Sequence, residues 1–177
     1  MKYTEGVKKG GFFEGYWVND KRQGHGKIIY NDKNYYSFEG EYQNDIDYGK
    51  GIKKYENLDK ELFCVEEGFF KDGKLEGRPG IIKMYPRQYK DREIKYECNF
   101  INGVPEGYGK CINYIEGDGK YIYEGNFHNY FENGKGVRYY LEHPHVSRIE
   151  GNFKDGRMNG NCNVYYKNGI IKNEFFY

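Results

Sequence analysis

A glutamate recurs at the same position of a repeated motif in this sequence. The motif reads FEGEYQNDIDYGKG at 38–51, and similar motifs begin near residues 13, 66, 96, 123 and 149. The recurring residues are Glu14, Glu39, Glu67, Glu97, Glu124 and Glu150. Acid–base catalysis would need two carboxylates in unlike environments, whereas this set is equivalent by repetition. We therefore expect either structural bonds to neighbouring backbone, Lys or Tyr groups, or a row of acceptors for a basic peptide.

The other residue types that could do chemistry form no recognisable site in the sequence. Cysteines at 64, 98, 111 and 162 show no CxxC spacing and no partner histidines, which predicts reduced thiols. The histidines show no converging set of the kind that zinc requires. No glycine-rich loop precedes the Lys-Ser or Lys-Thr of a phosphate-binding loop. We expect no enzyme, no cofactor and no metal.

The charge balance argues against several classes of partner. The chain has 28 Lys and Arg against 27 Asp and Glu, a formal net charge of +1. Such a balance creates no long-range field for nucleic acid or an anionic membrane. The stretch MKYTEGVKKGG is too polar for a signal peptide, and no apolar run reaches membrane-spanning length. We expect a soluble cytoplasmic protein that does not bind nucleic acid.

Aligning the motifs on their first glycine separates a constant half from a variable half. That column is Gly15, Gly40, Gly68, Cys98, Gly125 and Gly151. A second glycine follows at one constant spacing in every copy: Gly24, Gly49, Gly77, Gly107, Gly134 and Gly160. A residue that stays glycine either approaches a neighbour closely or has a positive φ, and both reasons remain open here.

The constant half is typical of a β-hairpin. Aromatic residues lie two positions after the first glycine, and mostly apolar residues lie two before it, which is the period of a strand. Asn or Asp comes four positions after it, followed by glycine in three copies, a strong hairpin-turn signal. A lone hairpin is marginally stable, so the hairpins must stack. The prediction is an all-β fold: an elongated single-layer stack of antiparallel β-hairpins with about six repeats and twelve strands.

The repeat pattern also predicts the domain organisation. Residues 1–12 form an N-terminal cap, and 13–173 hold six repeats that start near 13, 38, 66, 96, 123 and 149. Residues 174–177 form a C-terminal cap or a partial repeat.

The pattern aromatic-Glu-Gly-x-aromatic followed by Gly-x-Gly resembles the MORN (membrane occupation and recognition nexus) repeat. The resemblance covers residues 13–166, with departures at Cys98 and Cys162 and an extra residue in GRPG at 77–80. It implies a concave groove that accepts extended or helical peptides, and an association of some members with phosphoinositides.

The aromatic column has two competing roles, packing in the core or lining this groove. Large aromatic residues at the centre of an interface supply much of its binding energy. We therefore expect a partner groove formed by Tyr16, Trp17, Tyr42, Phe70, Phe100, Phe127, Phe153, Glu39 and Glu124.

The longest variable segment, IIKMYPRQYKDREIKY at 81–96, is rich in basic residues. They are Lys83, Arg87, Lys90, Arg92 and Lys95. This basic insertion is either a solvated long hairpin or a contact for a phosphoinositide headgroup, with small affinity on its own.

These observations predict a non-enzymatic scaffold or adaptor that binds other proteins through the groove or its ends. Family resemblance implies a place in a ciliary axoneme, such as a radial spoke, or in a cortical cytoskeleton. The alternative is a peripheral membrane module that uses the basic insertion.

Overall fold

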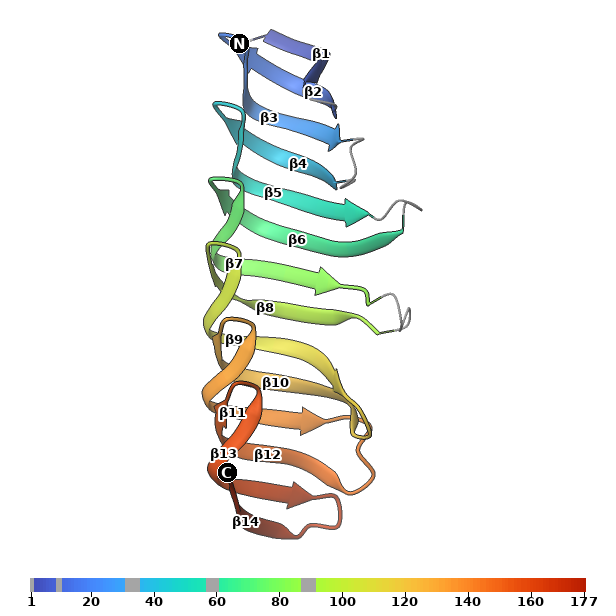
Figure 1. The fold of residues 1–177 in the computed structure, drawn as a ribbon, viewed down its shortest axis with the longest axis vertical. Coiled ribbons are helices and arrows are strands. Elements are labelled where there is room, and N and C mark those ends of the chain that lie inside the picture. Colours follow the sequence, from blue (N-terminus) through green and yellow to red (C-terminus); the bar gives the residue numbers. More distant parts are fainter. Residues whose placement is uncertain (1, 9–10, 31–35, 57–60, 87–91) are drawn as a thin grey trace.

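The computed structural model describes residues 2–8, 11–30, 36–56, 61–86 and 92–177 (Figure 1). The described residues form one antiparallel sheet in which each strand pairs with the next in chain order. The strands are β1 (Lys2–Lys8), β2 (Gly11–Val18), β3 (Lys21–Tyr30), β4 (Tyr36–Gln43), β5 (Ile46–Glu56), β6 (Leu62–Lys71), β7 (Lys74–Met84), β8 (Ile94–Ile101), β9 (Val104–Ile115), β10 (Gly119–His128), β11 (Phe131–Tyr140), β12 (Val146–Lys154), β13 (Arg157–Tyr166) and β14 (Ile171–Phe176). The predicted all-β hairpin stack is confirmed.

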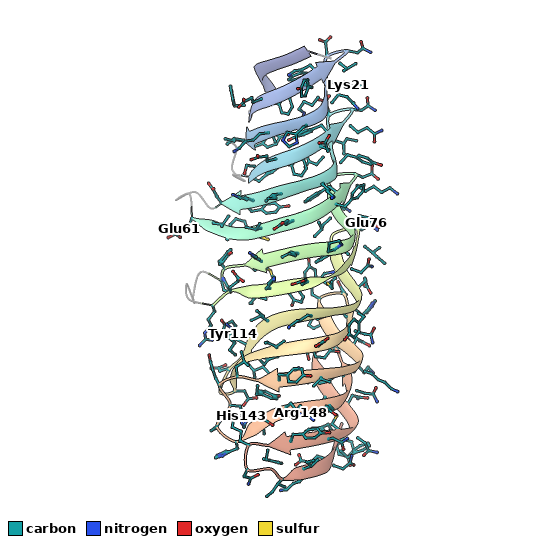
Figure 2. All side chains as sticks on the ribbon, turned by 180° about the vertical axis from the view of Figure 1, so that it is seen from behind. Lys21, Glu61, Glu76, Tyr114, His143 and Arg148 are labelled. Atoms are coloured by element: carbon teal, nitrogen blue, oxygen red, sulfur yellow. The ribbon has the colours of Figure 1, made fainter. Side chains whose placement is uncertain are left out.

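The described sheet has 14 strands, two more than the twelve expected. Six hairpins run from β2/β3 to β12/β13, and β1 and β14 add one strand at each end. A sheet edge offers unpaired N–H and C=O groups, which favours such additions. Hairpin turns follow one side of the stack, with Lys21 and Glu76 there, and Tyr114 and His143 lie on the other side (Figure 2).

The hairpin turns have the backbone that the Asn and Asp column predicted. The six residues have φ between 50° and 54°, and the residue after each is also left-handed. Two consecutive positive φ values define a type I′ turn, whose twist matches that of the flanking strands. The second central residue is not always glycine: Asp20, Asp45 and Tyr130 take that conformation at φ 59°, 73° and 69°.

The two reasons for glycine fall on different columns. The second glycine of every repeat is left-handed, with φ from 68° to 77°. The first and third glycines instead leave space for a neighbouring group, which is the ring of the same repeat in the first, second and fifth repeats; Gly68 also has a positive φ, of 151°. A Cβ on Gly15 would lie 2.6 Å from the Phe13 ring and 2.8 Å from the Cα of Gly26. Each hairpin also shifts register at or beside its first glycine, a bulge that bends the strands.

The core lies on one face, where rings of successive repeats pack edge to face. The ring before the first glycine of one repeat contacts the ring after the first glycine of the next. Centroid distances are 5.1 Å for Phe13–Tyr42 and 5.0 Å for Phe38–Phe70. The contact repeats at 5.1 Å for the Tyr123 ring on Phe153. Such pairs add stability beyond the area that they bury.

Where no ring of the same repeat lies against these glycines, another side chain fills the space. In the fourth repeat the Cβ of Cys98 fills the space beside Gly109. In the sixth repeat the side chain of Cys162 fills the space beside Gly151. In the third repeat Glu66 replaces the ring, and a Cβ on Gly80 would meet the Phe100 ring instead. The departures from the motif therefore conserve the packing.

Two repeats hold a buried ion pair inside the core face. Lys53 Nζ lies 2.7 Å from Asp47 Oδ2, and Arg138 bonds Glu132, with both pairs buried. The equivalent positions of the third repeat are apolar, Leu75 and Ile82. Lys53 also donates to the Gly73 carbonyl and Arg138 to that of Gly156. Each cation thereby joins its own hairpin to the turn of the next hairpin through a hydrogen bond.

Candidate functional site: a groove on the glutamate face

The face opposite the core carries the recurring glutamates. Strand pairing places them in one continuous line across the sheet, with one residue from each intervening strand between them. We call this line the glutamate row, and the face that carries it the glutamate face. The row is Glu14, Lys27, Glu39, Ile52, Glu67, Ile81, Glu97, Lys110, Glu124, Val137 and Glu150.

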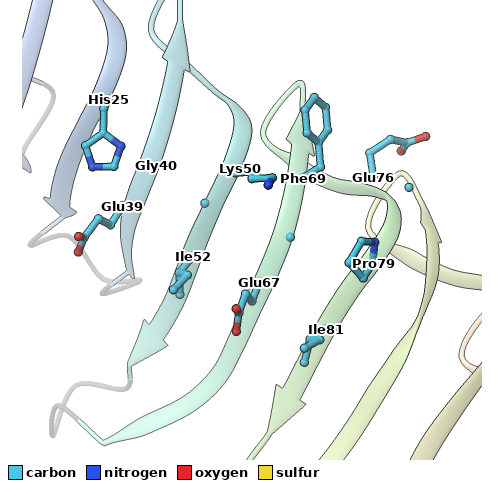
Figure 3. A pocket seen from close by; sticks show the side chains of 13 residues that line it. His25, Glu39, Gly40, Lys50, Ile52, Glu67, Phe69, Glu76, Pro79 and Ile81 are labelled. Atoms are coloured by element: carbon cyan, nitrogen blue, oxygen red, sulfur yellow. The ribbon is translucent and has the colours of Figure 1, made fainter.

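Three adjoining hollows follow the glutamate row and form a groove. The largest has a volume of about 690 Å³, and its lining includes Glu39, Ile52, Glu67 and Ile81 (Figure 3). It shares Pro79 with the second hollow, of about 310 Å³. The second shares its Tyr108 and Glu124 with the third, of about 480 Å³. The groove therefore extends from His25 on β3 to Asn163 on β13.

Most glutamates of the row also bond their neighbours, as the structural role predicted. Lys27 Nζ lies 3.2 Å from Glu39 Oε2, and the hydroxyl of Tyr108 donates to Glu124 at 2.9 Å. Tyr165 donates to Glu150 in the same way. A bond from Lys95 lowers the pKa of the exposed Glu97 carboxyl. These carboxylates are held in place by their neighbours.

The groove combines acidic and apolar side chains. Its lining holds six carboxylates, from Glu39, Glu67, Glu76, Glu97, Glu124 and Glu150. Against them stand three lysines, Lys50, Lys110 and Lys135. Phe69 and Tyr108, 41% and 52% exposed, add aromatic surface. The arrangement can hold a partner that offers both cations and apolar groups.

Comparison with known families identifies the repeat. The MORN repeat family matches residues 13–35, 96–113, 123–140 and 150–170. The chain is a MORN repeat protein. No curated protein matches it closely enough to be informative. MORN repeats are a non-enzymatic module for interaction with proteins or membranes.

The predicted aromatic lining of the MORN groove needs a correction. Of the column, Tyr42, Phe70, Phe100, Phe127 and Phe153 are at most 3% exposed, and they fill the core. Trp17 is half-buried against Phe13, and only Tyr16 of the predicted aromatics is exposed. Alternate residues of a strand point to opposite faces, so a column that fills the core cannot also line the opposite groove. Glu39 and Glu124 do line it.

The apolar residues of the groove were missed by the sequence interpretation. Ile52, Ile81 and Val137 lie between successive glutamates of the row. The available signal was their position after the second glycine, which places them opposite a glutamate once the hairpin register is known.

The described basic residues of the insertion do not line the three hollows of the groove in the MORN stack, although Ile81 at the start of the insertion does. Arg87 and Lys90 lie outside the described residues. Lys83 and Lys95 face each other across β7 and β8, and Lys95 Nζ is 2.9 Å from Glu97. The guanidinium of Arg92 lies 5.2 Å from the centre of the Tyr114 ring. Two of the three described cations are therefore engaged within the chain.

The remaining reactive side chains are enclosed or dispersed. All four cysteines are free thiols, and burial raises the pKa of Cys64 to about 12. Such a thiol stays protonated at neutral pH and is a poor nucleophile. Within the described ranges, no group of three or more His, Cys, Asp and Glu side chains is placed to hold a metal ion. The same ranges contain no helix long and apolar enough to cross a membrane.

Proposed function

We propose that this MORN repeat protein is a non-enzymatic scaffold that binds a segment of a partner protein along the groove. The observation that carries the proposal is the continuity of the groove over successive hairpins, in which the glutamates of the row alternate with Ile52, Ile81, Lys110 and Val137. A compact metabolite would contact only one hollow. A polypeptide segment can contact all three, so the length of the groove favours a protein partner.

The interactions of such a partner follow from the lining. Apolar side chains of the partner would bury Ile52, Phe69 and Tyr108, which are exposed in the free chain. Cationic side chains would bond carboxylates that are already held in place by neighbours, so that little side-chain entropy is lost on binding.

A matched pair of isoleucine substitutions tests the proposal. Ile52 lies in the groove and is 38% exposed, whereas Ile101 lies at a hairpin tip outside it and is 49% exposed. In crosslinking pull-downs from the native cells, Ile52→Lys should lose the partners of the unaltered chain, and Ile101→Lys should retain them. Both variants must give the β-sheet circular-dichroism spectrum of the parent. Retention of every partner by a folded Ile52→Lys variant would contradict the proposal.

The alternative is a peripheral membrane module that uses the basic insertion. Lys83 and Lys95 are paired across β7 and β8 there, which places two lysines at neighbouring positions of the sheet. Changing Lys83, Arg87, Lys90, Arg92 and Lys95 to Glu should then abolish binding to phosphoinositide vesicles. If this change alone removes the native association and Ile52→Lys does not, the membrane module is the better account.

We further propose a cytoskeletal setting, in a ciliary axoneme or a cell cortex. Its support is the resemblance to MORN-only proteins of such assemblies. A tagged copy should concentrate on microtubule structures, and a diffuse distribution would argue against this setting.

A further inference from the structure

We infer that the segment held in the groove adopts a polyproline II conformation and carries a basic residue at every third position. This inference rests on the proposed function, because it names the partner chemistry for the same groove. It follows from the spacing of the acidic residues together with the character of the groove between them.

The spacing of the acids sets a period for the ligand. Glu39, Glu67, Glu97, Glu124 and Glu150 lie on β4, β6, β8, β10 and β12, which are alternate strands. Neighbouring strands are ~4.8 Å apart, so successive carboxylates repeat at ~9.6 Å. A polyproline II helix rises ~3.1 Å per residue with three residues per turn, which repeats at ~9.3 Å. Four intervals of the row span ~38 Å, and twelve residues of such a helix span ~37 Å.

Other regular conformations do not match this period. In an extended strand three residues cover ~10 Å, but side chains alternate, so every second cation would point away from the groove. In an α-helix ~9.6 Å corresponds to roughly 6.4 residues, which is not a whole number of turns. Successive cations would therefore rotate off the row. Of these conformations, only polyproline II keeps residues i, i+3 and i+6 on one line at the spacing of the acids.

The surface between the acids suits the remaining two residues of each turn. Ile52 and Ile81 lie midway between successive glutamates of the row. The exposed ring of Phe69 is held edge to face against Tyr48 with centroids 5.7 Å apart, and Tyr108 lies farther along the groove. Aromatic-lined grooves are the usual receptors for proline-rich segments, whose fixed backbone loses little entropy on binding. Charge and shape thus indicate the same class of ligand.

Synthetic peptides test the period directly. The first probe is an amidated peptide of five Lys-Pro-Ala triplets, and the second has the same composition with its lysines at alternate positions. Binding to the full chain is measured by calorimetry at low and physiological salt. The triplet peptide should bind about tenfold tighter than its isomer, because only its cations match the spacing of the row.

Paired charge variants locate the binding. The combined change Glu67→Gln and Glu97→Gln removes two carboxylates of the row, and Glu116→Gln with Asp155→Asn removes two outside the groove. The triplet peptide should lose at least about tenfold in affinity with the first variant and keep it with the second. Equal binding of both peptides, no binding of the triplet peptide, or equal effects of the two variants would overturn the inference. Loss of native partners by Ile52→Lys would still uphold the groove, so the two failures are distinguishable.

Discussion

At the residue scale, glycines that look alike in the sequence serve different purposes. Gly134 has φ 77°, and a Cβ there would meet only Asn126 atoms at 3.8 Å or beyond. Two residues later, a Cβ on Gly136 would lie 2.3 Å from the Tyr123 hydroxyl oxygen. Gly134 is needed for its backbone conformation, and Gly136 for the space that it leaves to the Tyr123 ring.

Alanine at these two positions should therefore act by different mechanisms. Gly134→Ala should cost about 1 kcal/mol of unfolding free energy through left-handed strain, and Gly134→Asn less, because Asn tolerates that conformation. Gly136→Ala should cost about 2–3 kcal/mol because the Tyr123 ring must move. Urea unfolding measures both. A Tyr123→Ala, Gly136→Ala double variant should be clearly non-additive, and simple additivity would refute the steric account.

A carboxyl group in an aromatic position introduces a pH dependence. Glu66 takes the place of the ring in the third repeat, and Tyr55 donates to it at 3.3 Å. Burial raises the pKa of Glu66 above its ordinary value near 4.5, although Lys53 and Tyr55 lower it. The folded state thus binds this proton more tightly than the unfolded state, and the stability contributed by protonation is lost as the pH rises past 4.5.

Replacing Glu66 with a neutral isostere should remove this loss. Glu66→Gln is expected to be more stable than the parent at pH 7, with the difference vanishing toward pH 4. Thermal unfolding over a pH series checks the prediction. If Gln is instead destabilising at neutral pH, the attraction between Glu66 and Lys53 outweighs the burial cost.

At the element scale, each hairpin depends on its neighbour. Turn backbones bond the preceding repeat, as from Asp45 N to Arg22 O and from Gly156 N to Glu132 O. In the second and fifth repeats, buried Lys53 and Arg138 add a hydrogen bond to the turn of the next hairpin. In the third repeat, the apolar pair Leu75 and Ile82 occupies the equivalent positions. Burying a charge pair costs desolvation free energy, so the pair avoids destabilising the fold only when both partners are present.

Converting the ion pair of the fifth repeat to the apolar pair of the third tests this dependence. Arg138→Ile alone should cost about 3–5 kcal/mol, since it leaves Glu132 buried without its cation. Glu132→Leu combined with Arg138→Ile reproduces Leu75 and Ile82, and should recover most of the loss. Chemical denaturation of both variants gives the comparison. A double variant no better than Arg138→Ile would show that the cation is needed for its bond to Gly156.

At the scale of the whole molecule, one sheet layer becomes a long body with two unlike faces. Buried rings cover the core face, while the opposite face keeps the groove open. Figure 1 shows the elongated outline of the single sheet. The 14 strands at ~4.8 Å give a length of ~67 Å.

Small-angle scattering should detect this shape. A compact chain of 177 residues would have a radius of gyration of about 16 Å, whereas a stack of this length should give about 20 Å or more. A value near 16 Å would mean that the hairpins do not form an extended stack in solution.

The elements that depend on local chemistry could be predicted from the sequence. The hairpins and their turns were predicted from three features: the period of two, the column of Asn and Asp residues, and the constant spacing of the glycines. Each feature depends on a local φ value or on the face of a strand. The MORN resemblance and the equivalence of the glutamates came from the same repetition. Even the repeat that carries Glu66 and the extra residue of GRPG forms its hairpin.

Which column is buried and which is exposed depends on contacts between hairpins that the local sequence does not report. Phe70 and Glu67 belong to strand faces that a period of two distinguishes but does not assign to core or solvent. That assignment depends on the bend at the bulges and on rings from adjacent repeats, which are contacts between hairpins. The same contacts separate the glycine that accommodates a ring from the glycine with a positive φ. The predicted groove aromatics at 42, 70, 100, 127 and 153 therefore fill the core face, while Glu39 and Glu124 line the groove on the opposite face.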